Sequence, residues 1–265
     1  MNTRMADAPL PLSVAIITRD EEANLPRCLE SVAGLAAEIV VLDSGSTDAT
    51  VAIARRFGAR VEITDWPGFT IQKNRALTAC RQPWVLSLDA DESLSPELAD
   101  AIRALFAAGM PAVRGYWMNR RNRYLGAWLH HAWTPEWRLR LVARAHARWV
   151  GGRVHEQLCV DGPTERLAGN LLHESYQQLD EHLQRTLDYA RLGAEDLIAR
   201  GEPFRAHKLL LSPWGRLLRI LIWQQAWRDG WRGLLIAASS MLAAFAKYAF
   251  VLEHRLRRDR DAPPP

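Results

Sequence analysis

Apolar residues in the first ninety positions fall into short runs separated by stretches with helical spacing. Leu25, Cys28, Leu29 and Val32 lie at positions i, i+3, i+4 and i+7, a spacing that predicts a helix with one buried face. Four short runs are predicted to be strands: Ser13–Thr18, Glu38–Leu42, Arg60–Thr64 and Trp84–Leu88. The first of them is an apolar run of the kind that is buried on both faces of a parallel sheet. Strands that alternate with single helices imply right-handed crossovers. The pattern therefore predicts an α/β fold with a mostly parallel, Rossmann-like sheet.

The pattern changes in the second half of the chain. Residues 111–160 are rich in Trp and Arg and show few helical signals, and a polar helix is predicted over residues 180–199. After Gly201, Glu202 and Pro203 the composition shifts again. We therefore expect three parts: a catalytic domain over residues 10–204, a helical segment over 205–258 and a disordered tail over 259–265.

The segment 205–258 combines tryptophan, aliphatic and basic residues. From Arg205 onward the chain holds eleven Lys or Arg and four Asp or Glu, a balance of +7, against −3 for the remainder. The longer apolar stretch, from Leu234 to Leu252, is interrupted by Ser239, Ser240 and Lys247. It therefore falls short of the ~20 apolar residues of a membrane-spanning helix. We expect amphipathic helices on an anionic membrane surface. Packing against the catalytic domain is the alternative, and the apolar content disfavours nucleic acid.

The number and spacing of the cysteines indicate the cellular compartment. Cys28, Cys80 and Cys159 are widely spaced and provide neither a disulfide framework nor a CxxC metal pair. This favours a reducing cytoplasm. With the basic segment, it predicts a peripheral or monotopic protein on the cytoplasmic face of the inner membrane.

The strongest chemical signal is the run Leu88-Asp-Ala-Asp-Glu92, directly after the fourth predicted strand. Two carboxylates one residue apart at the carboxyl end of a buried strand can share Mg²⁺ or Mn²⁺, which bind oxygen ligands and often bridge to phosphates. The alternative is a solvated acidic turn before the helix that begins near Ser95.

Two other enzyme classes fit poorly. A haloacid dehalogenase phosphatase carries its DxD motif after the first strand, whereas this motif follows the fourth. A Rossmann dehydrogenase needs G-x-G-x-x-G after the first strand, and this chain has Thr18-Arg-Asp-Glu-Glu22 there.

Several short motifs together resemble the family 2 glycosyltransferases, and more narrowly the lipopolysaccharide core β-1,4-glucosyltransferase group. The resemblance runs from about residue 12 to residue 255. The motifs are Ala15-Ile-Ile-Thr-Arg-Asp-Glu-Glu22, Val41-Leu-Asp-Ser-Gly-Ser-Thr-Asp48, Gln72-Lys-Asn74, Leu88-Asp-Ala-Asp-Glu92, Tyr124-Leu-Gly126, Trp137-Arg-Leu-Arg-Leu141, Val154-His-Glu156 and Leu172-His173. The resemblance implies a GT-A fold that binds a nucleotide-diphosphate sugar, such as a UDP-sugar, across the strand ends.

The resemblance also implies roles for residues near the nucleoside. Ile17, Thr18 and Glu21 would border the base and ribose. Asp43 would contact the base or ribose, with Ser44 beside it where many family members carry a second Asp. For Asp43 the alternative is a capping role in the Ser-Gly-Ser-Thr turn.

Further residues would serve the diphosphate and the metal. Lys73 and Asn74 stand where a pyrophosphate neighbour is expected, and Lys is a suitable point charge for phosphate. An exposed helix lysine is the alternative for Lys73. Asp89 would face the ribose and the metal, and Asp91 would ligate the metal directly.

An inverting transferase needs a base beside the acceptor hydroxyl. The resemblance favours Glu156, although a structural ion pair with Arg140 or Arg153 is the alternative. Arg140 and His155 would stabilise the departing diphosphate, and His173 would add a metal ligand unless it is simply a core residue.

These inferences together predict an inverting, Mg²⁺- or Mn²⁺-dependent glycosyltransferase acting on a membrane glycolipid, in lipopolysaccharide core assembly. Two rivals remain from the sequence. One is a polyprenyl-phosphate sugar synthase, which shares the fold, and the other is a non-catalytic membrane-bound carbohydrate-binding module.

Overall fold

The structure is a computed structural model that describes residues 8–151 and 156–261. The described chain forms two compact units. The first comprises the residues up to Asn122 and residues 135–174, and the second comprises residues 123–134 and those from Ser175 onward.

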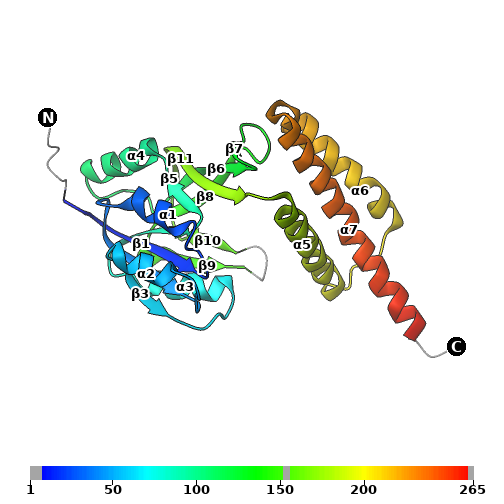
Figure 1. Cartoon of the computed structure of the whole chain (residues 1–265), viewed down its shortest axis with the longest axis horizontal. Helices are drawn as coiled ribbons and strands as arrows, with labels where there is room; N and C mark the ends of the chain where they lie inside the picture. The colour runs from blue at the N-terminus through cyan, green and yellow to red at the C-terminus, as the bar shows by residue number, and fades with distance from the viewer. Residues whose placement is uncertain (1–7, 152–155, 262–265) are drawn as a thin grey trace. The chain divides into compact units, whose positions relative to one another are not determined.

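The first unit is built on a mixed sheet (Figure 1). Its strand order is β3-β2-β1-β4-β8-β6-β11-β5. Its strands are β1 (Leu10–Thr18), β2 (Ala36–Asp43), β3 (Arg60–Ile63), β4 (Trp84–Asp89), β5 (Glu92–Leu94), β6 (Gly115–Tyr124), β8 (Glu136–Ala143) and β11 (Thr164–Tyr176), with β9 (Ala147–Val150) and β10 (Gln157–Val160) forming a separate pair. β6 and β11 continue into the second unit.

The first half of the sheet is parallel, and the predicted α/β class is confirmed. β1 pairs in parallel with β2 and with β4, and β2 pairs in parallel with β3. The other half is antiparallel, because β8 pairs antiparallel with β4 and β6, and β11 with β5. The sequence pattern did not predict this antiparallel half.

Side chains on the two sheet faces pack against different elements, as the two-residue period of a strand requires. Leu12, Val14 and Ile16 face one hydrophobic cluster, whereas Ala15 belongs to the other. The helices of the first cluster are α1 (Leu25–Val32), α2 (Thr50–Arg56) and α4 (Pro96–Ala107), and α3 (Phe69–Ala79) packs in the second. Both faces are therefore covered, which leaves the strand ends for a site.

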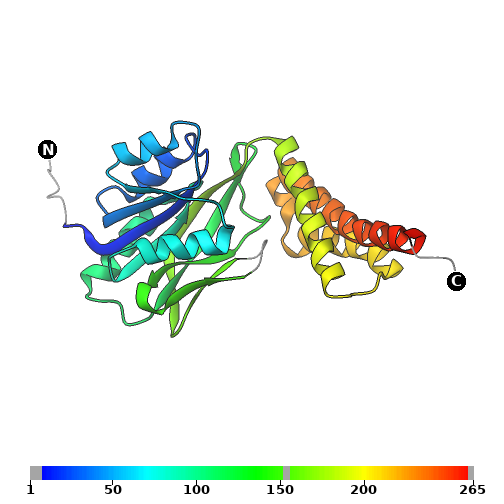
Figure 2. The same ribbon diagram turned by 90° about the horizontal axis from the view of Figure 1, so that it is seen from below.

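The second unit is mainly helical, and α5 and α6 each pack against α7 (Figures 1 and 2). Its elements are β7 (Ala127–Trp128), α5 (Leu179–Ala199), α6 (Ala206–Leu218), the π-helical turn η2 (Arg219–Trp223), the 3-10 turn η3 (Ala226–Asp229) and α7 (Trp231–Asp261), while the short turn η1 (Arg144–His146) lies in the first unit. Residues 179–199 were predicted to lie in the catalytic domain, which was expected to extend to residue 204. In the structure they form α5, which packs with α7 and whose buried face includes Ala190 and Ala194.

The long C-terminal helix differs from the expectation in two respects. α7 continues to Asp261, into the segment 259–265 that was expected to be disordered, and ion pairs from Arg255 to Asp259 and from Arg257 to Glu253 support its last turns. By length and composition α7 also meets the criterion for a membrane-crossing helix, with a window of mean hydropathy 1.8. The interruptions at Ser239, Ser240 and Lys247 had predicted a stretch too short to span.

Candidate active site

The carboxyl ends of β1, β2 and β4 meet at one edge of the sheet. In the parallel register Thr18 lies beside Asp43, and Ile17 lies beside Asp89. Ligands of open α/β sheets bind at this edge. The fold thus brings the residues predicted to bind the donor together from segments that are far apart in the sequence.

Asp89 is held between two cationic side chains. Lys73 Nζ lies 2.8 Å from Asp89 Oδ1, and Arg140 Nη2 lies 2.7 Å from Asp89 Oδ2. Burial alone would raise the pKa of Asp89, but Lys73 and Arg140 hold it well below its usual range. Asp89 is therefore a carboxylate at neutral pH, with both oxygens bound to cations.

Glu92 completes this charged cluster, a role that the sequence motifs did not predict. Its side chain is fully buried and accepts hydrogen bonds from Arg140 Nη2 at 2.7 Å and from the backbone N–H of Asp89 at 3.1 Å. Burial would lower the pKa of Arg140, but Glu92 and Asp89 raise it. Glu92 thus fixes both the Asp89 turn and the guanidinium. A glutamate directly after a DxD turn and inside a strand was the available signal.

Lys73 links Asp89 to the predicted base. Its Nζ lies 3.2 Å from Glu156 Oε1 and 4.5 Å from the centroid of the Trp149 ring. The side chain is only 6% exposed, so the alternative of an exposed helix lysine is wrong. Glu156 pairs with Lys73 rather than with Arg140.

Asp91 lies on the other side of the turn and faces His173 on β11. His173 Nε2 is 3.2 Å from Asp91 Oδ2. Asp91 Oδ1 is buried and has no hydrogen-bond partner among the described residues, and an unpaired buried carboxylate oxygen is costly unless a cation binds it. Within residues 8–151 and 156–261 no group of three or more His, Cys, Asp or Glu side chains is arranged to hold a metal.

The Asp43 carboxylate stabilises the loop that follows β2. Its Oδ1 accepts from the backbone N–H groups of Gly45 and Ser46, and its Oδ2 accepts from Thr18 Oγ1 at 3.0 Å. Ser44 Oγ accepts from the amide of Gln72 at 3.1 Å. These bonds match the capping alternative for Asp43, and its role in donor binding stays a prediction.

Two further predicted residues have structural partners. The Asn74 amide bonds both the N–H and the C=O of Trp149, each at 2.9 Å, and so joins α3 to β9. The backbone of Glu21 donates to Thr50 Oγ1 at 2.7 Å, and its carboxylate accepts from Asn24. His155 lies outside the described residues, as does Arg153.

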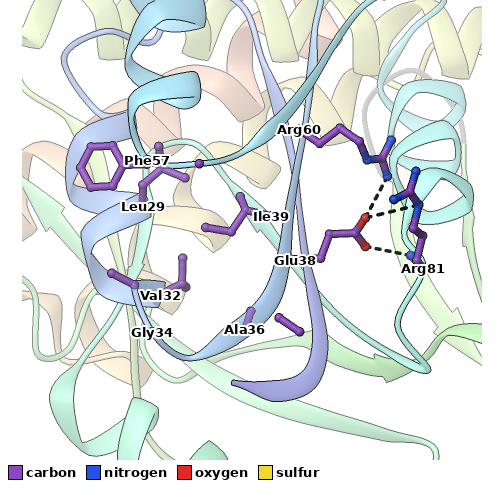
Figure 3. A pocket seen from close by; sticks show the side chains of 12 residues that line it. Leu29, Val32, Gly34, Ala36, Glu38, Ile39, Phe57, Arg60 and Arg81 are labelled. Atoms are coloured by element: carbon purple, nitrogen blue, oxygen red, sulfur yellow. Dashed lines mark hydrogen bonds and ion pairs between the residues drawn. The ribbon is translucent and has the colours of Figure 1, made fainter. Parts of the chain in front are cut away.

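A hollow at the opposite end of β2 does not involve any predicted site residue (Figure 3). Glu38, Arg60 and Arg81 line one side of it, and apolar side chains such as Leu29 and Phe57 line the other. It lies at the amino end of a parallel strand, where α/β folds do not usually place their ligands.

Comparison with known proteins identifies the family. The sequence model described as glycosyl transferase family 2 matches residues 13–157. The chain is 33% identical to the lipopolysaccharide core biosynthesis glycosyltransferase LpsC of Rhizobium meliloti (strain 1021) over an alignment of 263 residues that covers 95% of this chain and 95% of that protein. It is 29% identical to the uncharacterized glycosyltransferase RT0209 of Rickettsia typhi (strain ATCC VR-144 / Wilmington), over 89% of this chain and 84% of that protein.

Among solved structures, glucosyl-3-phosphoglycerate synthase from Mycobacterium tuberculosis aligns with a TM-score of 0.45 and 22% identity, over 66% of this chain and 76% of that chain.

The family match covers more than half of the chain and contains the Asp89–Asp91 turn, Lys73 and Glu156. The chain therefore belongs to glycosyl transferase family 2 and is a glycosyltransferase.

Proposed function

We propose that this glycosyltransferase moves a sugar, with inversion, from a nucleotide-diphosphate sugar to a membrane glycolipid in lipopolysaccharide core assembly. The observation that carries the chemistry is the convergence of Lys73, Arg140, Asp89 and Glu156 at one strand edge, with Asp91 on the turn that follows. The identity to LpsC over nearly the whole of both chains supports the lipopolysaccharide core assignment.

Lys73 and Arg140 are the proposed diphosphate-binding cations. In the structure their charges are neutralised by Asp89, Glu92 and Glu156. A diphosphate, as in a UDP-sugar, would compete for them, because phosphate oxygens accept charge-assisted hydrogen bonds from both Arg and Lys. Thr18, Asp43 and the loop after β2 would then border the nucleoside.

The proposed divalent cation, Mg²⁺ or Mn²⁺, would be held by Asp91 and His173. The unpaired, buried Oδ1 of Asp91 fits a cation. Two protein ligands are enough when substrate phosphates and water complete the shell. When bound, the ion would neutralise charge on the leaving diphosphate. Asp89 would be a third ligand through the remaining lone pairs of its oxygens, which already contact Lys73 and Arg140.

Glu156 is the proposed general base. The acceptor hydroxyl would lose its proton to Glu156 while its oxygen attacks the anomeric carbon, and the bond from that carbon to the diphosphate would break on the opposite face. Lys73 lies between Glu156 and Asp89. A shift of Lys73 toward the diphosphate would therefore leave the Glu156 carboxylate ready to accept the proton.

The second unit is the proposed membrane-binding part, on the cytoplasmic face of the inner membrane. Large apolar side chains are exposed along α6, η2, η3 and the start of α7: Leu210, Leu211, Trp214, Leu218, Ile222, Trp223, Trp227, Trp231 and Leu234. Much of this row follows helical spacing, and Arg216, Arg219 and Arg228 are interspersed with it. Interfacial tryptophans beside basic residues suit anionic lipid headgroups.

A nucleotide-sugar panel tests the donor and the metal together. We expect one UDP-sugar to raise the unfolding midpoint with Mn²⁺ present, and EDTA to abolish the rise. Transfer assays would then compare a lipid A-core acceptor with a polyprenyl phosphate. Transfer only to the polyprenyl phosphate would replace the proposed acceptor, and the absence of any donor turnover with Mn²⁺ would contradict the proposed reaction.

A further inference from the structure

His173 lies between two polar side chains of the first unit, one on each side of its ring. Its Nδ1 is 2.7 Å from Asn122 Oδ1, and its Nε2 is 3.2 Å from Asp91 Oδ2. Asn122 comes from β6 and is almost fully buried. The imidazole therefore has a defined contact at each nitrogen, and which nitrogen carries the proton depends on what Asn122 presents to it.

Glu136 determines which end of the Asn122 amide faces the histidine. Asn122 Nδ2 donates to Glu136 Oε2 at 3.0 Å, and Arg120 donates to both oxygens of the same carboxylate. Burial alone would raise the pKa of Glu136, but Arg120 and Arg138 lower it to about 2. Glu136 is therefore an acceptor only, so the NH₂ group of Asn122 faces it and the amide oxygen faces His173.

An amide oxygen can only accept, so the neutral His173 ring must carry its proton on Nδ1. The unprotonated Nε2 then points at the Asp91 carboxylate, whose Oδ1 is also buried and without a partner among the described residues. Two electron-pair donors that face each other repel unless a metal ion or a second proton on the ring lies between them. From this arrangement we infer that Asn122 and Glu136 are positioning residues that hold His173 in the Nδ1–H tautomer, so that Nε2 and Asp91 together form the metal-binding pair.

This inference rests on the metal part of the proposed function and adds two residues to it. Neither Asn122 nor Glu136 would touch the ion. Their effect would pass through the ring of His173, as outer hydrogen-bond partners of ligating histidines commonly act. Arg120 also lies 3.5 Å from Glu92, so the same network reaches the buried carboxylate beside Asp89.

The first experiment measures the tautomer in the metal-free full-length protein at pH 8, by long-range ¹H–¹⁵N NMR of the histidine rings. We expect a neutral His173 ring protonated at Nδ1. In Asn122→Ala the acceptor is lost, and the Nε2–H tautomer, which can donate to Asp91, should become the major form. Asn122→Asp retains an oxygen acceptor for His173, and a proton on its other carboxyl oxygen would preserve the hydrogen bond to Glu136, so the Nδ1–H form should be restored.

The second experiment measures Mn²⁺ affinity by EPR titration of the free ion. We expect binding to weaken about 10- to 100-fold in Asn122→Ala, with Asn122→Asp closer to the wild type. Asn170→Ala is the matched control, because Asn170 is an amide on β11 that bonds Asn119 at 3.0 Å rather than His173. It should bind Mn²⁺ as the wild type does. Thermal unfolding would confirm that each variant is folded.

Three results would overturn the inference: an Nε2-protonated or doubly protonated His173 in the wild type at pH 8, unchanged Mn²⁺ affinity in a folded Asn122→Ala, or an equal loss in Asn170→Ala. If Asn122→Ala does not fold, the wild-type tautomer and Asn122→Asp still decide the question. Failure of the proposed metal dependence looks different, because the wild type itself would then not bind Mn²⁺ while the tautomer result would stand.

Discussion

In the first unit charged side chains are buried, whereas in the second unit large aromatic side chains are exposed. Glu92 is fully buried and Arg140 is 4% exposed, while Trp223 is 83% exposed. Both arrangements cost free energy in the isolated protein, since buried charges lose hydration and exposed apolar surface orders water. This difference is the basis for proposing two separate binding partners: an anionic, metal-associated ligand for the first unit and a lipid surface for the second.

The substitution with the largest expected effect would inactivate the first unit alone. Asp91→Ala should abolish sugar transfer and the metal dependence of donor binding, because it removes the carboxylate with the unpaired buried oxygen. Liposome binding should not change. Donor turnover at saturating Mn²⁺ and liposome sedimentation measure the two properties. Asp100→Ala is the control, an exposed carboxylate paired with Arg103. Full turnover in Asp91→Ala would contradict the metal site.

A smaller effect distinguishes chemistry from donor binding within the same unit. Glu156→Gln should lower kcat by ~10² or more with little change in donor affinity, as expected when a general base is lost. Steady-state kinetics and a donor titration measure the two quantities, and Glu165→Gln on the exposed part of β11 is the control. A matched fall in donor affinity and kcat would instead assign Glu156 to the donor pocket.

The smallest expected effect concerns the second unit. Trp223→Ala combined with Trp227→Ala should weaken binding to anionic liposomes about tenfold or more, because apolar burial contributes ~25 cal/mol per Å². Donor turnover in solution should stay unchanged. Trp66→Ala, an exposed tryptophan of the first unit, is the control.

Salt and detergent extraction sharpen the same prediction. Salt should release the wild type only partly, since it screens the basic residues and not the apolar contacts, whereas detergent should release it fully. Two results would refute the membrane assignment: full-length protein that does not bind anionic liposomes, or a tag after Pro265 that is found in the periplasm.

The sequence predicted the parallel half of the sheet well, because β1, β2 and β4 contain local apolar runs and the edge strand β3 alternates charged and aliphatic residues. It also named the residues of the strand edge, since Lys73, Asp89 and Glu156 lie in short motifs. The structure brings these three together as expected. Whether they bind donor and metal stays a prediction.

The antiparallel half of the sheet could not be predicted from the sequence in the same way. Glu136, Arg138 and Arg140 alternate along β8 with Trp137 and Leu139, which resembles an ordinary strand with a solvated face. Arg140 is instead buried, because carboxylates from other segments surround it. Such pairing joins residues about 50 positions apart, as in Arg140 and Asp89. A local pattern contains no information on partners at that distance.

The loop between β6 and β8 has a consequence for how the chain is made. Leu129 and Ala132 in this loop are buried with residues of α7 such as Ile236 and Ala237. Arg232 donates to the carbonyl of Leu125, 107 positions earlier. At ribosomal speeds of ~5–20 residues per second, about 5–20 seconds pass before the part of α7 that packs on this loop is synthesised. During that time the loop lacks its α7 packing partners, so a ribosome stalled after β11 would expose these apolar side chains to chaperones.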